Sequence, residues 1–362
     1  MPAPVWEERV ELAQRFAPHL VLFPEEQDRG RPGQQVDRIG EYYPRGIGPL
    51  LERGQVRSGL FQPRQPSTLD ALAAFTRASD ELLLLGKALP DVEQAWKTYF
   101  EILDGADPRG QTGRERYPLT IYARVQTRGE ANAASAIPAN LGKDYPLAPE
   151  EIGRPFFLDR LDDDDVSLQY WFCYYYDDWA NQHEGDWEGI SLLLRRTSAG
   201  YEPVGAGYYA HETGTRRHWT EVERSVAGGL HPLVYVAAGS HASYFQYIPS
   251  GYFTTVPGLI IPVVNLRLRV LVSSTRMDRV PDCRFNPVEP QVQVLPDPVG
   301  PADPNDAAWQ HAKWLRFAGS WGVRVLSGLA YGGPRGPSHK GLKWHNPFAW
   351  AERYCAPDYL VY

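Results

Sequence analysis

The order of short β-forming runs after Tyr117 constrains the fold of this chain more than any other feature of its sequence. The runs are rich in Val, Leu, Ile, Tyr and Trp, which fit the pleated surface of a sheet, and clusters of Gly, Pro and Asp separate them. Because no helical pattern intervenes, this order indicates antiparallel pairing in a sandwich rather than a doubly wound α/β sheet. The predicted strands cover residues 119–125, 166–176, 187–194, 203–211, 233–238 and 266–272.

The N-terminal region precedes this series and has a different pattern. Residues 4–17 place apolar side chains at helical spacing, and Pro18 is expected to end that helix because proline disrupts the backbone hydrogen bonds of a helix interior. Residues 18–66 are rich in Gly, Pro and Arg, which is typical of loops and short strands. An N-terminal amphipathic helix is therefore predicted, followed by a segment that wraps a core built elsewhere.

A second helical pattern interrupts the chain before the strands begin. Ser67 and Thr68 can cap a helix that continues to residue 85, and residues 91–103 predict another helix after it. Together they predict a helical insertion at about 67–104 that packs over one sheet.

The fold class that these patterns predict is mainly β: one antiparallel β-sandwich domain over residues 1–362, with an N-terminal helix and a helical insertion. The composition agrees, since 43% hydrophobic and 22% charged residues are typical of a globular protein. The 11 Trp and 21 Tyr residues favour broad sheets over helical bundles.

Charge and hydropathy disfavour two classes of partner. The formal net charge is −7 and the sequence has no long Lys/Arg block, whereas phosphate recognition normally requires a basic surface. The longest apolar stretch, residues 256–264, is interrupted by Pro257 and Pro262 and is far shorter than the roughly 20 residues that span a bilayer. We therefore expect no nucleic-acid partner and no transmembrane segment.

The N-terminal residues and the cysteines indicate a reducing compartment. Residues 1–20 carry charged side chains among their apolar ones, so they lack the uninterrupted core of a signal peptide. Cys173, Cys283 and Cys355 are odd in number and widely spaced, which fits neither a disulfide framework nor a cysteine-rich zinc site. The prediction is a cytoplasmic protein with reduced thiols.

Cation-binding side chains are concentrated between the second and third predicted strands. Asp177, Asp178, His183, Asp186 and Glu188 all lie within a segment of twelve residues. In a strand that contains Asp186, Glu188 lies on the same face because side chains alternate with a period of two. Two carboxylates held this close repel each other unless a cation or a basic side chain neutralises them.

A divalent cation is the simplest partner for these carboxylates. His183 can approach from the preceding loop, and Asp177 or Asp178 can complete the site from the end of the previous strand. Oxygen ligands with one imidazole suit Mg²⁺, Ca²⁺ or Mn²⁺ better than a structural zinc. The alternative is that the aspartates belong to a turn and that Asp186 and Glu188 pair with arginines.

Two further histidines, His211 and His241, lie at the ends of predicted strands, where functional sites are often built. In a metal-dependent hydrolase either one would act as general acid or base towards an ion-activated water. The alternative is a hydrogen-bonded structural histidine. Ser240 does not form a hydrolase nucleophile turn, because the Gly-x-Ser-x-Gly pattern is absent.

Several sequence blocks resemble the vacuolar protein sorting-associated protein 62 family over roughly residues 15–350. The family name records a trafficking phenotype, so the resemblance implies no particular reaction, and the helical pair at 67–104 has no counterpart in it. The blocks are Leu-Gln-Tyr-Trp-Phe at 168–172, His-Glu-Gly-Asp-Trp-Glu-Gly-Ile at 183–190, the fifteen residues 231–245, Gly-Ser-Trp-Gly at 319–322, Gly-Pro-Ser-His-Lys-Gly at 336–341 and Trp-His-Asn-Pro at 344–347.

The block that begins at His183 is also similar to the signature of the necrosis- and ethylene-inducing-like proteins. Those are β sandwiches in which Asp, His, Asp and Glu side chains hold a divalent cation. The similarity implies that His183, Asp186 and Glu188 are ligands and that Asp177 is the upstream aspartate. Gly185 replaces the second histidine of that signature.

Three functions are compatible with such a site. The ion can bridge the protein to an anionic partner such as a lipid headgroup or a glycan, which the resemblance to a cation-dependent membrane-binding sandwich favours. It can instead activate water in a hydrolase, or it can only tie loops together. The missing signal peptide argues against a secreted, membrane-damaging role.

Overall fold

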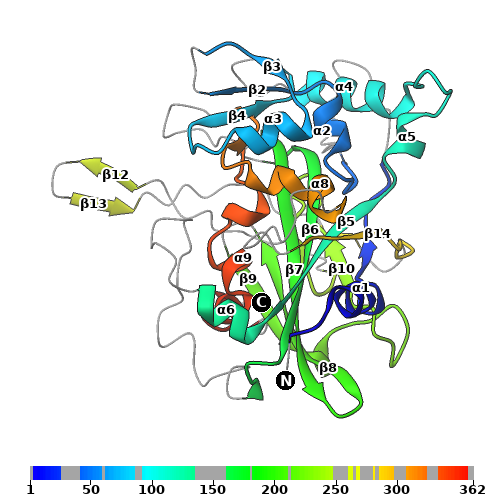
Figure 1. Cartoon of the computed structure of the whole chain (residues 1–362), viewed down its shortest axis with the longest axis vertical. Helices are drawn as coiled ribbons and strands as arrows, with labels where there is room; N and C mark the ends of the chain where they lie inside the picture. Colours follow the sequence, from blue (N-terminus) through cyan, green and yellow to red (C-terminus); the bar gives the residue numbers. More distant parts are fainter. Residues whose placement is uncertain are drawn as a thin grey trace.

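The computed structural model shows a mixed α/β protein built around one seven-stranded sheet (Figure 1). It describes residues 3–25, 41–58, 62–85, 92–134, 160–179, 182–210, 213–247, 260–263, 266–269, 280–281, 285–296, 307–323 and 333–357. The strand order in the sheet is β14-β5-β6-β7-β8-β9-β16. These strands are β5 (Thr120–Thr127), β6 (Val166–Asp177), β7 (His183–Thr197), β8 (Gly200–Ala210), β9 (Thr213–His218), β14 (Gln291–Val294) and β16 (Cys355–Pro357).

The centre of this sheet is antiparallel, as the sequence predicts. Strands β5 to β9 pair with their sequence neighbours in antiparallel register, and β6 and β7 are the longest of them. Both edges differ from the prediction, because β14 pairs parallel with β5 and β16 pairs parallel with β9. These edge strands come from distant parts of the chain, and only a long connection can bring a strand back in parallel orientation.

C-terminal segments cover one face of the sheet with aromatic rings. The Trp187 ring on β7 lies 5.4 Å from the Trp314 ring and 5.2 Å from the Trp321 ring, and the Trp171 ring on β6 lies 5.9 Å from the Trp344 ring. Sequence patterns did not predict these elements, because each is too short to show a periodicity. They are α8 (Ala307–Ala312), η3 (Lys313–Arg316), β15 (Ser320–Trp321), η4 (Pro337–His339), α9 (Leu342–His345) and α10 (Pro347–Arg353).

N-terminal elements and a smaller sheet contact the opposite face. The predicted N-terminal helix is confirmed as α1 (Trp6–Arg15), and the Tyr170 hydroxyl on β6 donates a hydrogen bond of 2.9 Å to the Ala13 carbonyl in it. The Tyr208 ring on β8 stacks on Phe245 at 3.7 Å, and its hydroxyl donates to the Leu233 carbonyl. The smaller sheet contains β1 (His19–Val21), β10 (Leu233–Val236) and β11 (Ser243–Tyr244). The packing of two sheets into a complete sandwich remains a prediction from the sequence.

The helical pair expected at 67–104 is correct only in part. The first helix, α3 (Leu69–Ala74), has the predicted cap, since the Ala71 N–H donates to the Thr68 hydroxyl. It ends at Ala74, however, and β4 (Asp80–Leu83) replaces the rest of the predicted helix. The second predicted helix is confirmed as α4 (Val92–Asp104).

Pairing with a neighbouring strand explains why the predicted helix ends at Ala74. Strand β4 pairs antiparallel with β2 (Gln55–Ser58), and the buried Arg57 guanidinium contacts the Glu81 carboxylate across this pair at 2.7 Å. A helix through Leu82 would lose both the ladder and this ion pair, so tertiary contacts override the helical spacing. With β3 (Gln65–Pro66) and β15, these strands form a four-stranded sheet at one end of the molecule, at the top of Figure 1.

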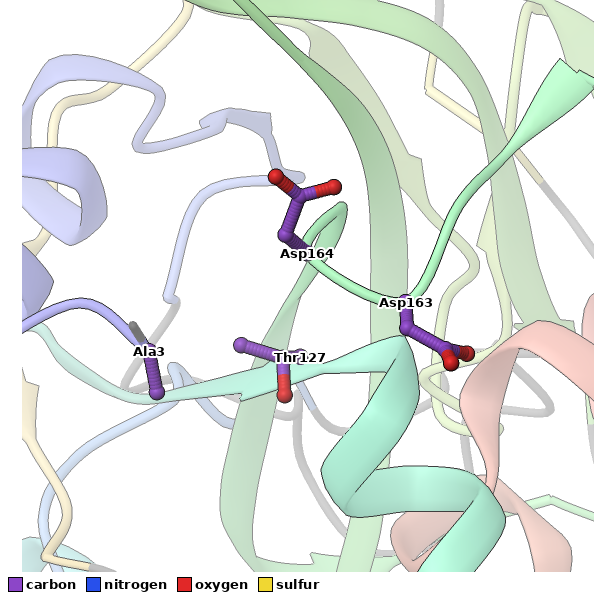
Figure 2. A pocket seen from close by; sticks show the side chains of 4 residues that line it. All are labelled: Ala3, Thr127, Asp163 and Asp164. Atoms are coloured by element: carbon purple, nitrogen blue, oxygen red, sulfur yellow. The ribbon is translucent and has the colours of Figure 1, made fainter. Parts of the chain in front are cut away.

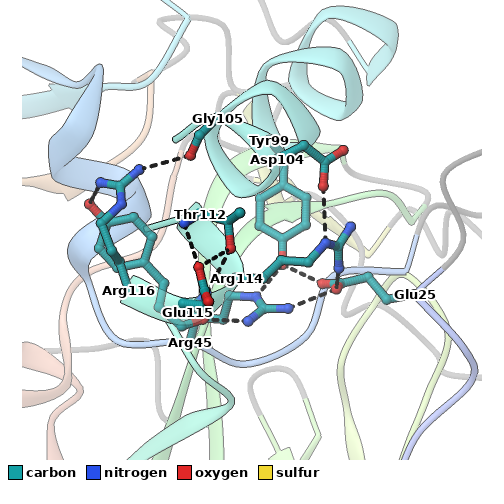
Figure 3. A network of polar contacts seen from close by, with 10 residues as sticks. Glu25, Arg45, Tyr99, Asp104, Gly105, Thr112, Arg114, Glu115 and Arg116 are labelled. Carbon is teal, nitrogen blue, oxygen red and sulfur yellow. Dashed lines mark hydrogen bonds and ion pairs between the residues drawn. The ribbon is translucent and has the colours of Figure 1, made fainter. Parts of the chain in front are cut away.

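A partly buried polar network fixes this end of the molecule to the N-terminal segment (Figure 3). The Glu25 carboxylate accepts hydrogen bonds from the Tyr99 hydroxyl at 2.5 Å, from Arg45 at 2.7 Å and from Arg114 at 3.0 Å. Arg114 also contacts Asp104. The remaining described elements are α2 (Gly48–Glu52), α5 (Gly113–Arg116), α6 (Arg128–Ala134), η2 (Trp219–Glu221), β12 (Ile260–Val263) and β13 (Leu266–Arg269).

Two other sequence predictions can be compared with the described residues. Cys173 and Cys355 are free thiols and both are buried, whereas Cys283 lies outside the described residues. In the described part of the chain, every helix is too short or too polar to cross a membrane.

Candidate metal centre

The candidate site lies where β6 ends and β7 begins. In this antiparallel pair Asp177 is opposite His183, and Tyr174 is opposite Asp186. Regular alternation along β7 would direct positions 183 and 186 to opposite faces. Between them Gly185 has a left-handed backbone with φ of +63°, which interrupts the alternation. As a result, ligand atoms of Asp177, His183 and Asp186 all lie within 4.8 Å of one another.

Gly185 is required by packing as well as by conformation. A Cβ atom at this position would lie 2.4 Å from the Trp321 carbonyl oxygen on β15, well inside van der Waals contact. L-residues also disfavour the left-handed region, which glycine occupies without penalty. Glycine at this position therefore has a steric reason, because no side chain fits here.

Hydrogen bonds define the chemical state of the His183 ring. Its Nδ1 lies 2.7 Å from the Gly185 carbonyl oxygen, which can only accept, so Nδ1 carries a proton. In the neutral ring Nε2 then presents its lone pair, and this atom lies 3.4 Å from Oδ2 of Asp177. Burial lowers the pKa of His183 below its usual 6.5, although the charge of Asp186 acts in the opposite direction. A neutral imidazole with an available lone pair is the form that binds a metal ion.

Both carboxylates are oriented by the backbone. Oδ1 of Asp177 accepts a hydrogen bond from the Trp179 N–H at 2.8 Å, and Oδ1 of Asp186 accepts one from the Trp187 N–H at the same distance. Oδ2 of Asp186 accepts from Nδ1 of His241 at 3.0 Å. The structure therefore pairs Asp186 with a histidine, and the alternative of an arginine partner is wrong for this residue.

The charge state of Asp186 follows from opposing effects. Burial alone would raise the pKa of this carboxyl group, but the hydrogen bond from His241, followed by the electrostatic effects of His183, His241 and Lys340, lowers it overall. Asp186 is thus an ionised carboxylate in a place with only 5% of its surface exposed. Burying such a charge is costly without compensation, and a metal ion is one group that compensates it.

Of the two candidates for the upstream aspartate, the structure brings Asp177 into the cluster. Asp177 lies in the cluster with His183 and Asp186, whereas Oδ1 of Asp178 accepts a hydrogen bond of 3.4 Å from the Gln182 side chain. Glu188 is opposite Phe172 on β6 and is buried, but it is outside the group of ligand atoms within 4.8 Å. Three of the four predicted ligands are therefore brought together.

The structure describes one of the two candidate acid–base histidines. His241 is in the loop between β10 and β11 and contacts the cluster directly through Asp186. Sequence reasoning identified this histidine but missed its link to Asp186, because 55 residues separate them. His211 lies outside the described residues.

A separate cavity does not share the chemistry of this cluster. It has a volume of about 240 Å³ and is lined by Ala3, Thr127, Asp163 and Asp164 (Figure 2). Its two carboxylates diverge in the view of Figure 2, and the Asp163 side chain accepts a hydrogen bond from Asn132. The metal-ligating geometry is confined to the β6–β7 cluster among the residues that the structure describes.

Comparisons with known proteins give only distant similarities. No family model and no curated protein matches the chain. Necrosis and Ethylene inducing Protein 2 from the causal agent of cocoa's Witches Broom disease is 14% identical with a TM-score of 0.21, over 40% of this chain and 52% of that one, about half its length. NLPPya in complex with glucosamine is 11% identical with a TM-score of 0.24, over 65% and 77% of the two chains. The non-toxic HaNLP3 protein is 13% identical with a TM-score of 0.20, over 49% and 67%.

Proposed function

We propose that this protein binds one divalent cation through Asp177, His183 and Asp186, with Glu188 as a fourth ligand from the next position on the same face of β7. The observation that carries the proposal is the 3.4 Å approach of the His183 Nε2 lone pair to Oδ2 of Asp177. Two electron-rich atoms at this distance repel unless a proton or a cation lies beside them. Because burial disfavours the protonated ring, a cation is the better partner.

The ligand set limits the identity of the ion. Two or three carboxylates with one imidazole form a hard, oxygen-rich site, which suits Mg²⁺, Ca²⁺ or Mn²⁺. A structural zinc site normally has four tetrahedral ligands with cysteine or several histidines, and this cluster contains a single histidine.

The bound ion offers a way to recognise an anionic partner. Mg²⁺ takes six ligands and Ca²⁺ takes six to eight, so three or four side chains leave coordination positions for other oxygens. We propose that oxygens of an anionic lipid headgroup or a glycan occupy them, which makes the protein a cation-dependent binding module. We also propose that the chain is a member of the vacuolar protein sorting-associated protein 62 family. The sequence blocks described above support this membership.

A metal-dependent hydrolase is the second candidate, and the pairing of Asp186 with His241 favours it. A carboxylate that holds Nδ1 of an imidazole leaves Nε2 available as a general acid or base. Nε2 of His241 is buried and has no hydrogen-bond partner among the described residues. His211 is the other candidate for this role.

Isothermal titration calorimetry with Mg²⁺, Ca²⁺ and Mn²⁺ tests the cation site. Wild type and an Asp163→Ala control, which changes a remote aspartate, should bind one ion, and Asp186→Ala should not. Equal binding by Asp186→Ala, or no binding by wild type at millimolar cation, would contradict the proposal.

A second experiment separates the two candidate functions. Ester and phosphoester substrates are screened with each cation, and vesicles of anionic lipid are tested with and without chelator. Turnover that Asp186→Ala abolishes would favour the hydrolase. Vesicle binding that chelator removes, without turnover, would favour the binding module.

A further inference from the structure

The backbone of His241 has an unusual conformation for a buried residue. Its φ is +56°, and within the described ranges no other non-glycine residue has a positive φ. Its side chain is completely buried. Non-glycine residues in the left-handed region are strained and persist only where the surroundings fix them, which is common at functional sites.

The surroundings fix the His241 ring on two sides. The imidazole stacks on the Tyr174 ring of β6 with centroids 3.9 Å apart and planes 7° from parallel. Its Nδ1 lies 3.0 Å from Oδ2 of Asp186 on β7. Because a carboxylate only accepts, Nδ1 carries the proton and donates it to this hydrogen bond.

The loop that carries His241 is held in place by its own backbone. The His241 N–H donates to the Ala237 carbonyl at 3.0 Å, and the Ala237 N–H donates to the Ala242 carbonyl at 2.9 Å. The loop is also attached to the end of β6, where the Asp178 N–H donates to the Gly239 carbonyl at 3.0 Å. The loop therefore holds Nδ1 of His241 as a fixed donor to Asp186. Its attachment to Asp178 lies directly after Asp177, another residue of the cluster.

We propose that His241 is a positioning residue for the cation site: it orients the Asp186 carboxylate toward the ion and does not itself bind the ion. The proposal rests on the proposed function. The cluster whose ligand atoms lie within 4.8 Å contains Asp177, His183 and Asp186 but not His241, which agrees with an indirect role. Residues that hydrogen-bond to metal ligands set their orientation, and their loss typically weakens metal binding roughly 10- to 100-fold.

This role would connect the small sheet to the metal site. The His241 loop joins β10 to β11, so an ion held by Asp186 would also stabilise the contact between the smaller sheet and the central one. A residue with only a packing role would stabilise the fold without changing the affinity of the folded protein for the ion. Affinity and stability therefore distinguish the two roles.

The test measures Mn²⁺ affinity of the full chain by calorimetry and by the electron paramagnetic resonance signal of free Mn²⁺. His241→Asn removes the imidazole at a position where asparagine tolerates a positive φ, and His241→Gly is a second variant with no backbone strain. Both should bind Mn²⁺ about 10- to 100-fold more weakly than wild type. His231→Asn is the matched control, because His231 precedes β10 but contacts the Ala17 carbonyl instead of the cluster.

Urea unfolding in chelator shows which variants are folded. A folded His241 variant that binds Mn²⁺ as tightly as wild type would overturn the positioning role. If Asp186→Ala loses Mn²⁺ binding in the same experiment, the proposed cation site would still be supported. If wild type itself binds no Mn²⁺, the proposed function fails first and the positioning role fails with it.

Discussion

The His183 imidazole faces the Asp177 carboxylate across the first pair of the β6–β7 hairpin, with Nε2 3.4 Å from Oδ2. The ring cannot rotate away without losing the hydrogen bond between Nδ1 and the Gly185 carbonyl. The hairpin therefore holds a nitrogen lone pair and a carboxylate oxygen in a fixed arrangement, as the proposed cation site requires. Such preorganisation reduces the cost of ordering ligands on binding.

We expect His183→Ala to weaken Mn²⁺ binding at least about tenfold, or about 1.4 kcal/mol. Affinity in wild type should decrease as pH falls, and the decrease should begin at a lower pH than for an ordinary imidazole, whose pKa is about 6.5. The reason is that the pKa of His183 is below 6.5, so a proton competes for Nε2 only at more acidic pH. Calorimetry at several pH values measures this, with the exposed His311→Ala as control. A decrease in affinity that begins above pH 7 would contradict the assignment.

Gly185→Ala should destabilise the protein and abolish cation binding. The left-handed backbone costs alanine about 1–2 kcal/mol, and the contact with the Trp321 carbonyl should add roughly 1–3 kcal/mol, as overpacking does. Urea denaturation measures the total decrease in the free energy of unfolding.

The matched control for this substitution is Gly228→Ala. Gly228 has a similar φ of +76°, but a Cβ atom there would meet nothing within 4 Å. The difference in the free energy of unfolding between the two variants measures the cost of the contact with β15. Equal losses of stability would show that this contact does not constrain the hairpin.

The sequence was sufficient to predict the central strands and most of the candidate metal cluster, for a physical reason. Asp177, His183 and Asp186 lie on two consecutive strands, so local pairing together with the left-handed backbone of Gly185 brings them together. The link between His241 and Asp186 depends on how a second sheet packs, and no local pattern encodes it. Likewise, apolar spacing through Leu82 fits a helix or a buried strand equally well, and the partner strand β2 decided the outcome.

Acid should destabilise the protein through His339. Burial and the charge of Arg335 lower the pKa of this histidine from 6.5 to about 4. Between these two pH values the unfolded chain binds a proton that the folded chain does not, so the free energy of unfolding decreases as pH falls. The full effect is on the order of 3 kcal/mol. His339→Gln should flatten the curve of stability against pH, whereas His311→Gln should not, and parallel curves for all three proteins would refute the assignment.

The last prediction concerns the thiols. Cys173 and Cys355 are free and fully buried, and burial raises the pKa of both thiols well above the usual range, so neither should react quickly in the native protein. Cys283, outside the described residues, is predicted to be reduced as well, because the three cysteines have no disulfide spacing. Titration with a thiol reagent should find all three after denaturation without reductant, the same number as in a fully reduced sample. A denatured protein with one reactive thiol would reveal a disulfide and would overturn the expectation of a reducing compartment.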